Sequence, residues 1–109
     1  MQTLKLADDL MECVTDGSKR VTVRAGKRDI ATGPLRFEAT DGSVNPLVVN
    51  VTRVVVRPLW NVPLWAVHGE GLFGWDDLME ALVRFYPDIT EDSDVTAIEF
   101  EFVEQVQAA

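Results

Sequence analysis

The amino-acid sequence predicts an α+β domain, in which several short strands form a small barrel and two or three helices lie beside it. Short segments in which polar and apolar residues alternate recur along the chain, which is typical of half-buried strands. Two other segments place apolar residues every three or four positions, as an amphipathic helix does. The 109 residues, 47% of them hydrophobic, are enough for one domain with one packed core over residues 1–109.

The N-terminal segment predicts a strand that leads into a helix. Residues 3–6 alternate between polar and apolar side chains, and residues 7–15 carry apolar side chains at helical spacing. Gly17 stands just past this helix, where a glycine commonly caps the C-terminus. A basic segment, residues 17–28, therefore begins where the first helix ends.

The next predicted strand has two different faces. Arg20, Thr22 and Arg24 alternate with Val21 and Val23. Because successive side chains of a strand point to opposite sides, the valines are expected to face the core and the polar residues to share the other face.

The middle of the chain predicts two more strands and an irregular segment. Residues 35–38 alternate between glycine-containing turns, and the valine-rich residues 47–56 predict a long, curved strand that Pro58 ends. Residues 60–68 are expected to hold one helical turn, and residues 69–71, Gly-Glu-Gly, a flexible connector.

The C-terminal third predicts a helix and a last strand. Residues 75–86 have the clearest helical spacing of apolar residues, and Pro87 stops the helix. Residues 95–103 alternate as a strand does, with one slip near Ala97. Phe102 is expected on the apolar face of this strand.

The charge distribution bears on the partner. A formal net charge of −8 argues against duplex DNA, because affinity for phosphate backbones depends on Lys and Arg. Residues 70–109 contain one basic and eleven acidic side chains, whereas five of the ten Lys and Arg lie within residues 19–28. One concentrated basic segment in an acidic chain favours a nucleoside or a short single-stranded RNA as the partner.

Cysteine usage and hydropathy indicate a cytoplasmic protein. Cys13 is the only cysteine, so no disulfide within the chain is expected, and no secretory signal is recognised. No run approaches the ~18 apolar residues of a membrane span, so no membrane partner is expected. The sequence leaves the oligomeric state open.

Lys19, Thr22 and Glu70 are the first candidates for catalysis. A hydroxyl is a weak nucleophile that needs a base nearby, and a desolvated lysine can supply one. A carboxylate in a loop, such as Glu70, can exchange protons with a substrate. Ordinary solvated side chains on an exposed strand and loop fit the same residues, and the bare pattern does not choose between the two interpretations.

Arg20, Arg24, Lys27 and Arg28 are candidates for substrate binding. Guanidinium groups bind phosphate or carbonyl oxygens through paired hydrogen bonds, and Gly26 would let the backbone approach a ligand. A charged hairpin whose arginines pair with surface acids is the alternative.

Neither a metal site nor a cofactor is expected. His68 has no second His or Cys at ligand spacing, and Cys13 reads as a core residue of the first helix. Trp75 lies on the apolar stripe of its helix and is assigned to the core, while Trp60 and Trp65 are open to base stacking.

The order of these features resembles the ASCH domain family. Its hallmark, a G-x-K-x-x-T-x-R-like segment after the first helix, is matched by Gly17, Lys19, Thr22 and Arg24. The resemblance covers roughly residues 4–102. It implies a PUA-like small β-barrel with flanking helices and a cleft against the barrel.

The family is discussed in connection with RNA binding, and it includes a small bacterial acetylcytidine amidohydrolase that this chain resembles in length and layout. The resemblance implies amide hydrolysis of an acylated cytidine, with Lys19 as base, Thr22 as nucleophile and Glu70 as proton donor. Glu70 matches the glutamate of that enzyme when one residue is inserted before residue 75. Arg24 would position the base or the oxyanion.

Two other functions remain open beside this one. A noncatalytic RNA- or nucleotide-binding module would use the same basic hairpin together with the tryptophans. An RNA-cleaving member of the family would use the same groups to activate a ribose hydroxyl.

Overall fold

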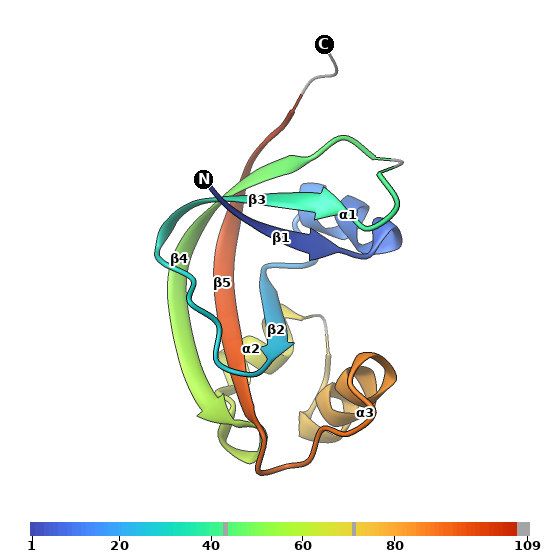
Figure 1. The fold of residues 1–109 in the computed structure, drawn as a ribbon, viewed down its shortest axis with the longest axis vertical. Coiled ribbons are helices and arrows are strands. Elements are labelled where there is room, and N and C mark those ends of the chain that lie inside the picture. Colours follow the sequence, from blue (N-terminus) through green and yellow to red (C-terminus); the bar gives the residue numbers. More distant parts are fainter. Residues whose placement is uncertain (43, 71, 107–109) are drawn as a thin grey trace.

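The predicted strands form one mixed sheet that curves into a half-barrel, with helices packed beside it (Figure 1). The computed structural model describes residues 1–42, 44–70 and 72–106. This architecture confirms the α+β, PUA-like fold predicted from the sequence. The strands are β1 (Gln2–Leu6), β2 (Val21–Ala25), β3 (Gly33–Ala39), β4 (Leu47–Pro58) and β5 (Asp94–Gln105). The helices are α1 (Asp8–Thr15), the short 3-10 helix η1 (Leu59–Asn61), α2 (Leu64–Gly69) and α3 (Trp75–Phe85).

The strand order β1-β3-β4-β5-β2 places β1 and β2 at the two edges of the sheet. β1 pairs parallel with β3, and the other neighbours are antiparallel. The two longest strands, β4 and β5, run through the whole molecule in Figure 1. Their register shifts at Val48/Val49 and again at Val51/Arg53. Because β-bulges bend and twist a strand, these two shifts help the sheet to curve and bring its edges toward each other.

The buried side chains form two clusters, where the sequence predicts one core. The first joins α1 to β1 and β3 and includes Met11 and Phe37, whose ring meets that of Phe100 edge-on at 5.1 Å. The second joins β2 to α2 and α3 and includes Val21 and Leu78. The curved sheet contributes to both clusters, since β5 supplies residues to each.

This sharing of β5 explains its irregular pattern. Residues 95–98 are all buried, because this part of the strand is covered on both faces. The break in alternation that the sequence shows near Ala97 therefore lies where neither face of the strand meets solvent. Phe102 lies beyond this stretch and is 39% exposed, so its expected burial is wrong.

The predicted connector at residues 69–71 is wrong in its first two residues. Gly69 is the last residue of α2, and Glu70 caps that helix with its backbone N–H bonded to Ala66 O at 3.2 Å. Gly69 is buried because α2 lies directly on β2: a Cβ atom added there would be 2.9 Å from Cβ of Val21 and closer still to its Cγ2. Gly71 lies outside the described residues.

Candidate functional site

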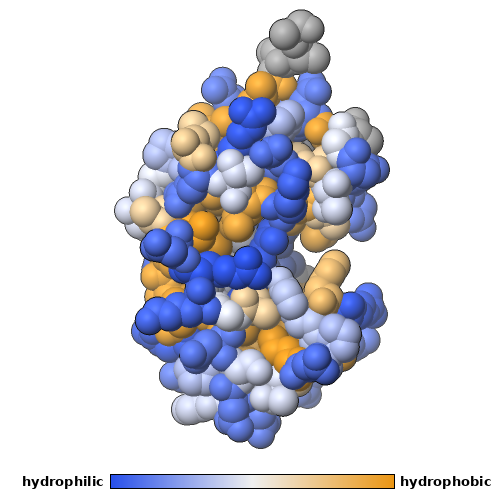
Figure 2. Space-filling view, in the orientation of Figure 1, coloured by the Kyte–Doolittle hydropathy of each residue, from blue (hydrophilic) through white to orange (hydrophobic). Residues whose placement is uncertain are grey.

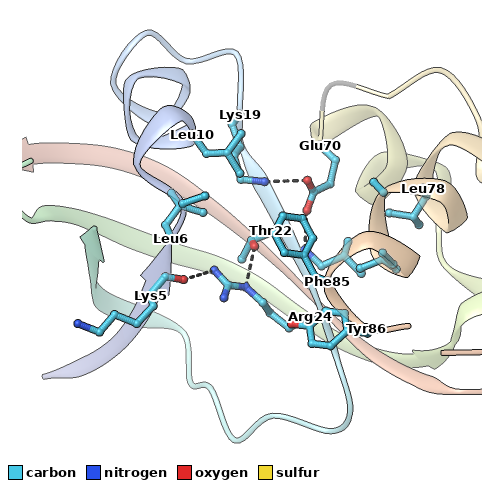
Figure 3. Close-up of a pocket in the computed structure, with 14 residues that line it drawn as sticks. Lys5, Leu6, Leu10, Lys19, Thr22, Arg24, Glu70, Leu78, Phe85 and Tyr86 are labelled. Atoms are coloured by element: carbon cyan, nitrogen blue, oxygen red, sulfur yellow. Dashed lines mark hydrogen bonds and ion pairs between the residues drawn. The ribbon is translucent and has the colours of Figure 1, made fainter. Parts of the chain in front are cut away.

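A pocket of about 120 Å³ lies at the open side of the half-barrel, between the two edge strands. The end of β1 and the start of α1 line one side of the pocket, and α3 lines the other. Figure 2 shows that the surface is indented between these two regions. Among the polar side chains that line the pocket, four point toward one another in Figure 3: Lys19, Thr22, Arg24 and Glu70.

Lys19 lies in the turn that follows α1 and is only 5% exposed. Its backbone N–H donates to Cys13 O at 2.9 Å, which fixes the turn against the end of the helix. The ammonium group donates to Val21 O at 2.9 Å and to Oε2 of Glu70 at 2.7 Å. A buried lysine needs such partners, because removing an ammonium ion from water is costly.

Glu70 reaches the pocket from the end of α2. Its Oε2 accepts from Lys19, and its Oε1 accepts the backbone N–H of Val23 at 2.6 Å. This N–H is available because β2 is an edge strand, with β5 on only one side. The carboxylate therefore accepts the hydrogen bond that the carbonyl of a further strand would otherwise accept, and it links the end of α2 to β2.

Thr22 is 3% exposed and lies on the opposite face of β2 from Val21 and Val23, which pack into the second cluster. This confirms the predicted two-faced strand for these three residues. Oγ1 of Thr22 accepts a hydrogen bond from Nε of Arg24 at 3.0 Å. Within the described residues, the hydroxyl hydrogen of Thr22 has no acceptor, so it is available to a base or a ligand.

Arg24 bridges the two edges of the sheet. Its Nε donates to Thr22 on its own strand, and its Nη2 donates to Lys5 O at the end of β1, at 2.7 Å. Burial lowers the pKa of Arg24, because the charged form loses water, and the nearby Tyr86 and Glu70 act in the opposite direction. The guanidinium group thus has defined protein partners in the absence of any ligand.

Three predicted substrate-binding residues do not line this pocket. Lys27 and Arg28 are exposed in the loop after β2, where the backbone N–H of Arg28 donates to Thr96 Oγ1 at 2.8 Å. Arg20 precedes β2 and lines a separate pocket with Trp65 and His68. Its backbone N–H bonds to Gly69 O in α2. Because Arg20 lines this second pocket and not the one with Thr22 and Arg24, the expectation that it shares their face is wrong. Ligand binding by these residues stays a prediction.

The aromatic side of the pocket was not predicted as part of the site. Phe85 and Tyr86, at the end of α3, line the pocket, and Tyr86 lies beside Arg24 in Figure 3. In the sequence they mark only the end of a helix. Their adjacency to the basic segment depends on how α3 packs on the second cluster through Leu78 and Leu82, which no local pattern reveals.

The tryptophans and His68 lie elsewhere. Trp75 is half-buried against the second cluster and donates its ring N–H to Leu59 O at 2.7 Å, which confirms its core role. Trp60 is 57% exposed, and the ring of Trp65 is covered by Arg53 at 3.8 Å. Over the described ranges, no cluster of three or more His, Cys, Asp or Glu side chains is placed to hold a metal ion. No helix within those ranges has the length and apolar character needed to cross a membrane.

Comparison with known proteins identifies the fold. By sequence, no protein-family model and no curated protein matches the chain. By structure, the chain is similar to a DUF984 family protein from Enterococcus faecalis, with a TM-score of 0.70 and 19% identity over 100% of this chain and 84% of that one. It is also similar to an ASCH domain from Lactobacillus crispatus, with a TM-score of 0.68 and 17% identity over 93% and 79% of the two chains. The ASCH protein of Zymomonas mobilis gives a TM-score of 0.64 and 17% identity over 95% and 71%.

Proposed function

Since the chain has the fold of ASCH domain structures, we propose that residues 1–109 act as one ASCH-like domain that hydrolyses the amide of an acylated nucleoside such as acetylcytidine. The observation that carries this proposal is the convergence of Lys19, Thr22 and Glu70 in one pocket. Lys19 and Thr22 belong to one segment, and Glu70, 51 positions from Lys19, is brought to them by the fold.

The reaction starts with a proton shift inside the ion pair. Nζ of Lys19 and Oε2 of Glu70 are 2.7 Å apart, so one proton can pass directly from the ammonium group to the carboxylate. This leaves an amine that can act as a base and a carboxylic acid that can act as a proton donor. No further residue is required to prepare either group.

Acyl transfer then follows with all atoms accounted for. Lys19 takes the hydroxyl proton of Thr22, and Oγ1 forms a bond to the acyl carbon of the substrate. As the carbon–nitrogen bond of the amide breaks, Glu70 gives its proton to the departing amine. The products are the free amino nucleoside, an acyl ester on Thr22 and the restored ion pair. Water then hydrolyses the ester and releases the carboxylic acid.

Arg24 supports this chemistry through its hydrogen bond to Thr22. The bond occupies a lone pair of Oγ1 and limits rotation of the side chain, and the positive charge stabilises an oxygen that is losing its proton. The position of Arg24 is itself fixed from β1 by Lys5 O.

The decisive experiment incubates the pure protein with acetylcytidine and follows the release of cytidine and acetate by chromatography. Thr22→Val keeps the shape of the side chain but removes the nucleophile, and Ser18→Ala alters an exposed hydroxyl in the same segment as a control. We expect release by the wild-type protein and by Ser18→Ala, and none by Thr22→Val. Equal release by Thr22→Val and the wild-type protein would eliminate the mechanism.

A noncatalytic nucleotide-binding module is the second candidate. It is favoured by the mutual pairing of Lys19 and Glu70, which satisfies both charges without a reaction. This candidate predicts that cytidine and acetylcytidine bind without turnover, and that Thr22→Val leaves their affinity nearly unchanged. Cleavage of unmodified RNA by the wild-type protein would instead indicate a ribonuclease.

A further inference from the structure

Phe85 is an exposed aromatic side chain at a pocket that is otherwise well packed. It is 66% exposed, although it is the last residue of α3, whose other face is buried in the second cluster through Leu78 and Leu82. The end of the helix is held in place, because the N–H of Tyr86 bonds to Leu82 O at 2.8 Å. The backbone that carries Phe85 is therefore held beside the pocket, and its ring is left largely exposed there.

The pocket offers a ligand two apolar walls. Leu6 and Leu10, from β1 and α1, lie on one side, and Phe85 with its neighbours on α3 lies on the other. Figure 3 shows Leu6 and Leu10 across the pocket from Leu78, with the ring of Phe85 drawn between Glu70 and Arg24. Two facing apolar walls suit a flat ligand, which contacts both at once.

Several polar groups of the pocket already have protein partners. Lys19 uses two of its three N–H groups, Arg24 uses Nε and one N–H of Nη2, and both oxygens of Glu70 accept hydrogen bonds. The positive charge of Lys19 is already paired with a carboxylate. Within the described residues, three of the five N–H groups of Arg24 make no hydrogen bond, so a ligand held beside Phe85 can still meet a donor.

From these contacts we propose that the pocket recognises a flat heterocyclic ring, and that Phe85 is the surface on which this ring stacks. The substrate class is then a nucleobase or nucleoside. This inference rests on the proposed function for the identity of the reacting group, but stacking on Phe85 does not require catalysis. Phe85 is a binding residue that decides specificity for the ring.

The test measures binding in the absence of turnover. Titration calorimetry uses the Thr22→Val background with acetylcytidine, cytidine, cytidine 5′-monophosphate and N-ethylacetamide, an amide without a ring. Phe85→Ala removes the stacking surface, Phe85→Tyr retains it, and Val83→Ala is the matched control. Val83 is 40% exposed on the same helix and does not line the pocket.

We expect Phe85→Ala to weaken binding of acetylcytidine and cytidine by about five- to one-hundred-fold, the range of base–aromatic stacking. Phe85→Tyr and Val83→Ala should bind as the parent does, and the ringless amide should bind far more weakly. Cytidine 5′-monophosphate should lose affinity by the same factor in Phe85→Ala, because the base and not the phosphate stacks on the ring.

Unchanged affinity in Phe85→Ala, or no binding of any ring-containing probe, would overturn the inference. A loss of affinity confined to cytidine 5′-monophosphate would also overturn it, because it would place Phe85 against the phosphate and not against the base. The outcomes are separable from those of the hydrolysis assay. Loss of cytidine affinity in Phe85→Ala without any release of acetate by the wild-type protein leaves the stacking role and removes the hydrolase. Hydrolysis by the wild-type protein together with unaltered binding by Phe85→Ala leaves the hydrolase and removes the stacking role.

Discussion

Lys19 and Glu70 are 51 positions apart in the sequence and meet with 2.7 Å between Nζ and Oε2. Their side chains are 6% and 17% exposed, so the pair is largely withdrawn from water. The ion pair connects the turn after α1 with the end of α2, and one oxygen of Glu70 extends the connection to the backbone of Val23. It is therefore both the proposed proton-transfer unit and a structural tie between distant segments.

Removing both partners of this pair should destabilise the protein by less than the sum of the two single removals. Glu70→Gln leaves the Lys19 ammonium buried without its carboxylate, and Lys19→Met leaves the carboxylate without its ammonium. We expect each single change to lower the free energy of unfolding by about 3 kcal/mol. The double variant should lose less than the sum of the two, because no unpaired charge remains. Urea unfolding of all four proteins measures this, and additive losses would contradict the expected coupling.

Arg24→Lys should impair turnover with little effect on substrate affinity. A lysine cannot make both hydrogen bonds with the geometry of a guanidinium group, so either Thr22 or Lys5 O loses its donor. We expect kcat to fall about 10- to 100-fold with KM nearly constant, as for an interaction that matters most in the transition state. Arg28→Lys, in the exposed loop, is the matched control and should retain full activity. A fall in kcat of equal size in both variants would show that Arg24 has no special position.

Gly69→Ala should destabilise the protein, although glycine to alanine in a helix is ordinarily stabilising. The added methyl group meets Val21, the neighbour 2.9 Å away at Cβ, and something must move. We expect a loss of about 1–3 kcal/mol, typical of an overpacked core. In a Val21→Ala background the same change should cost less, because Cγ2 is gone. Thermal or urea unfolding of the four proteins tests this, and a gain in stability from Gly69→Ala would contradict the close contact between α2 and β2.

Asp16 should contribute to the acid sensitivity of the turn before Lys19. The hydroxyl and the backbone N–H of Ser18, the latter at 2.8 Å from Oδ1, lower the pKa of Asp16 below the ordinary value of an aspartate. Because the folded-state pKa is depressed, the stabilising contribution is present above the unfolded pKa and disappears as the pH falls through the lower, folded-state value. Asp16→Asn should therefore be less stable than the wild-type protein at pH 6, with a smaller difference at pH 2 to 3. Unfolding curves at the two pH values measure it, and a constant difference would argue against ionisation as the cause.

Lys27 and Arg28 should distinguish a nucleoside site from an RNA-binding surface. Both lie outside the pocket, so Lys27→Ala combined with Arg28→Ala should leave cytidine affinity unchanged. Affinity for a short single-stranded RNA should fall in the same protein and should depend less on salt, if these side chains contact phosphates. Titrations at two salt concentrations measure both effects. A weakened affinity for cytidine would place the loop in contact with the nucleoside.

The sequence was sufficient to predict the strands and the two larger helices, because their periodicity is local. Through the resemblance to a family motif, it also indicates Lys19 and Thr22 as two site residues of one segment. The sequence indicates Glu70 as a candidate, but the glycines beside it predict a loop. In the structure, Gly69 packs on Val21 and α2 extends up to Glu70. A contact between residues so far apart has no trace in local spacing.

Arg20 shows the opposite limit of pattern reasoning. Strict alternation assigns Arg20 to the face of Thr22, yet its N–H bonds to Gly69 O before the strand begins. The contact between Arg24 and Lys5 O has no sequence signal for a related reason, since Lys5 O is a backbone carbonyl on the other edge strand. Backbone acceptors carry no sequence signature, and Phe85 similarly enters the site only through the placement of α3.

The position of the pocket between the two hydrophobic clusters has a consequence for local stability. The α1 wall belongs to the first cluster and the α3 wall to the second, and β1 and β2 are joined across the pocket by the side chain of Arg24. Such clusters can open with separate free energies, in the way that cooperative units do in hydrogen-exchange measurements. A bound ring that touches both walls couples the two units, so amide protons of α1 and α3 should gain protection together when the pocket is filled.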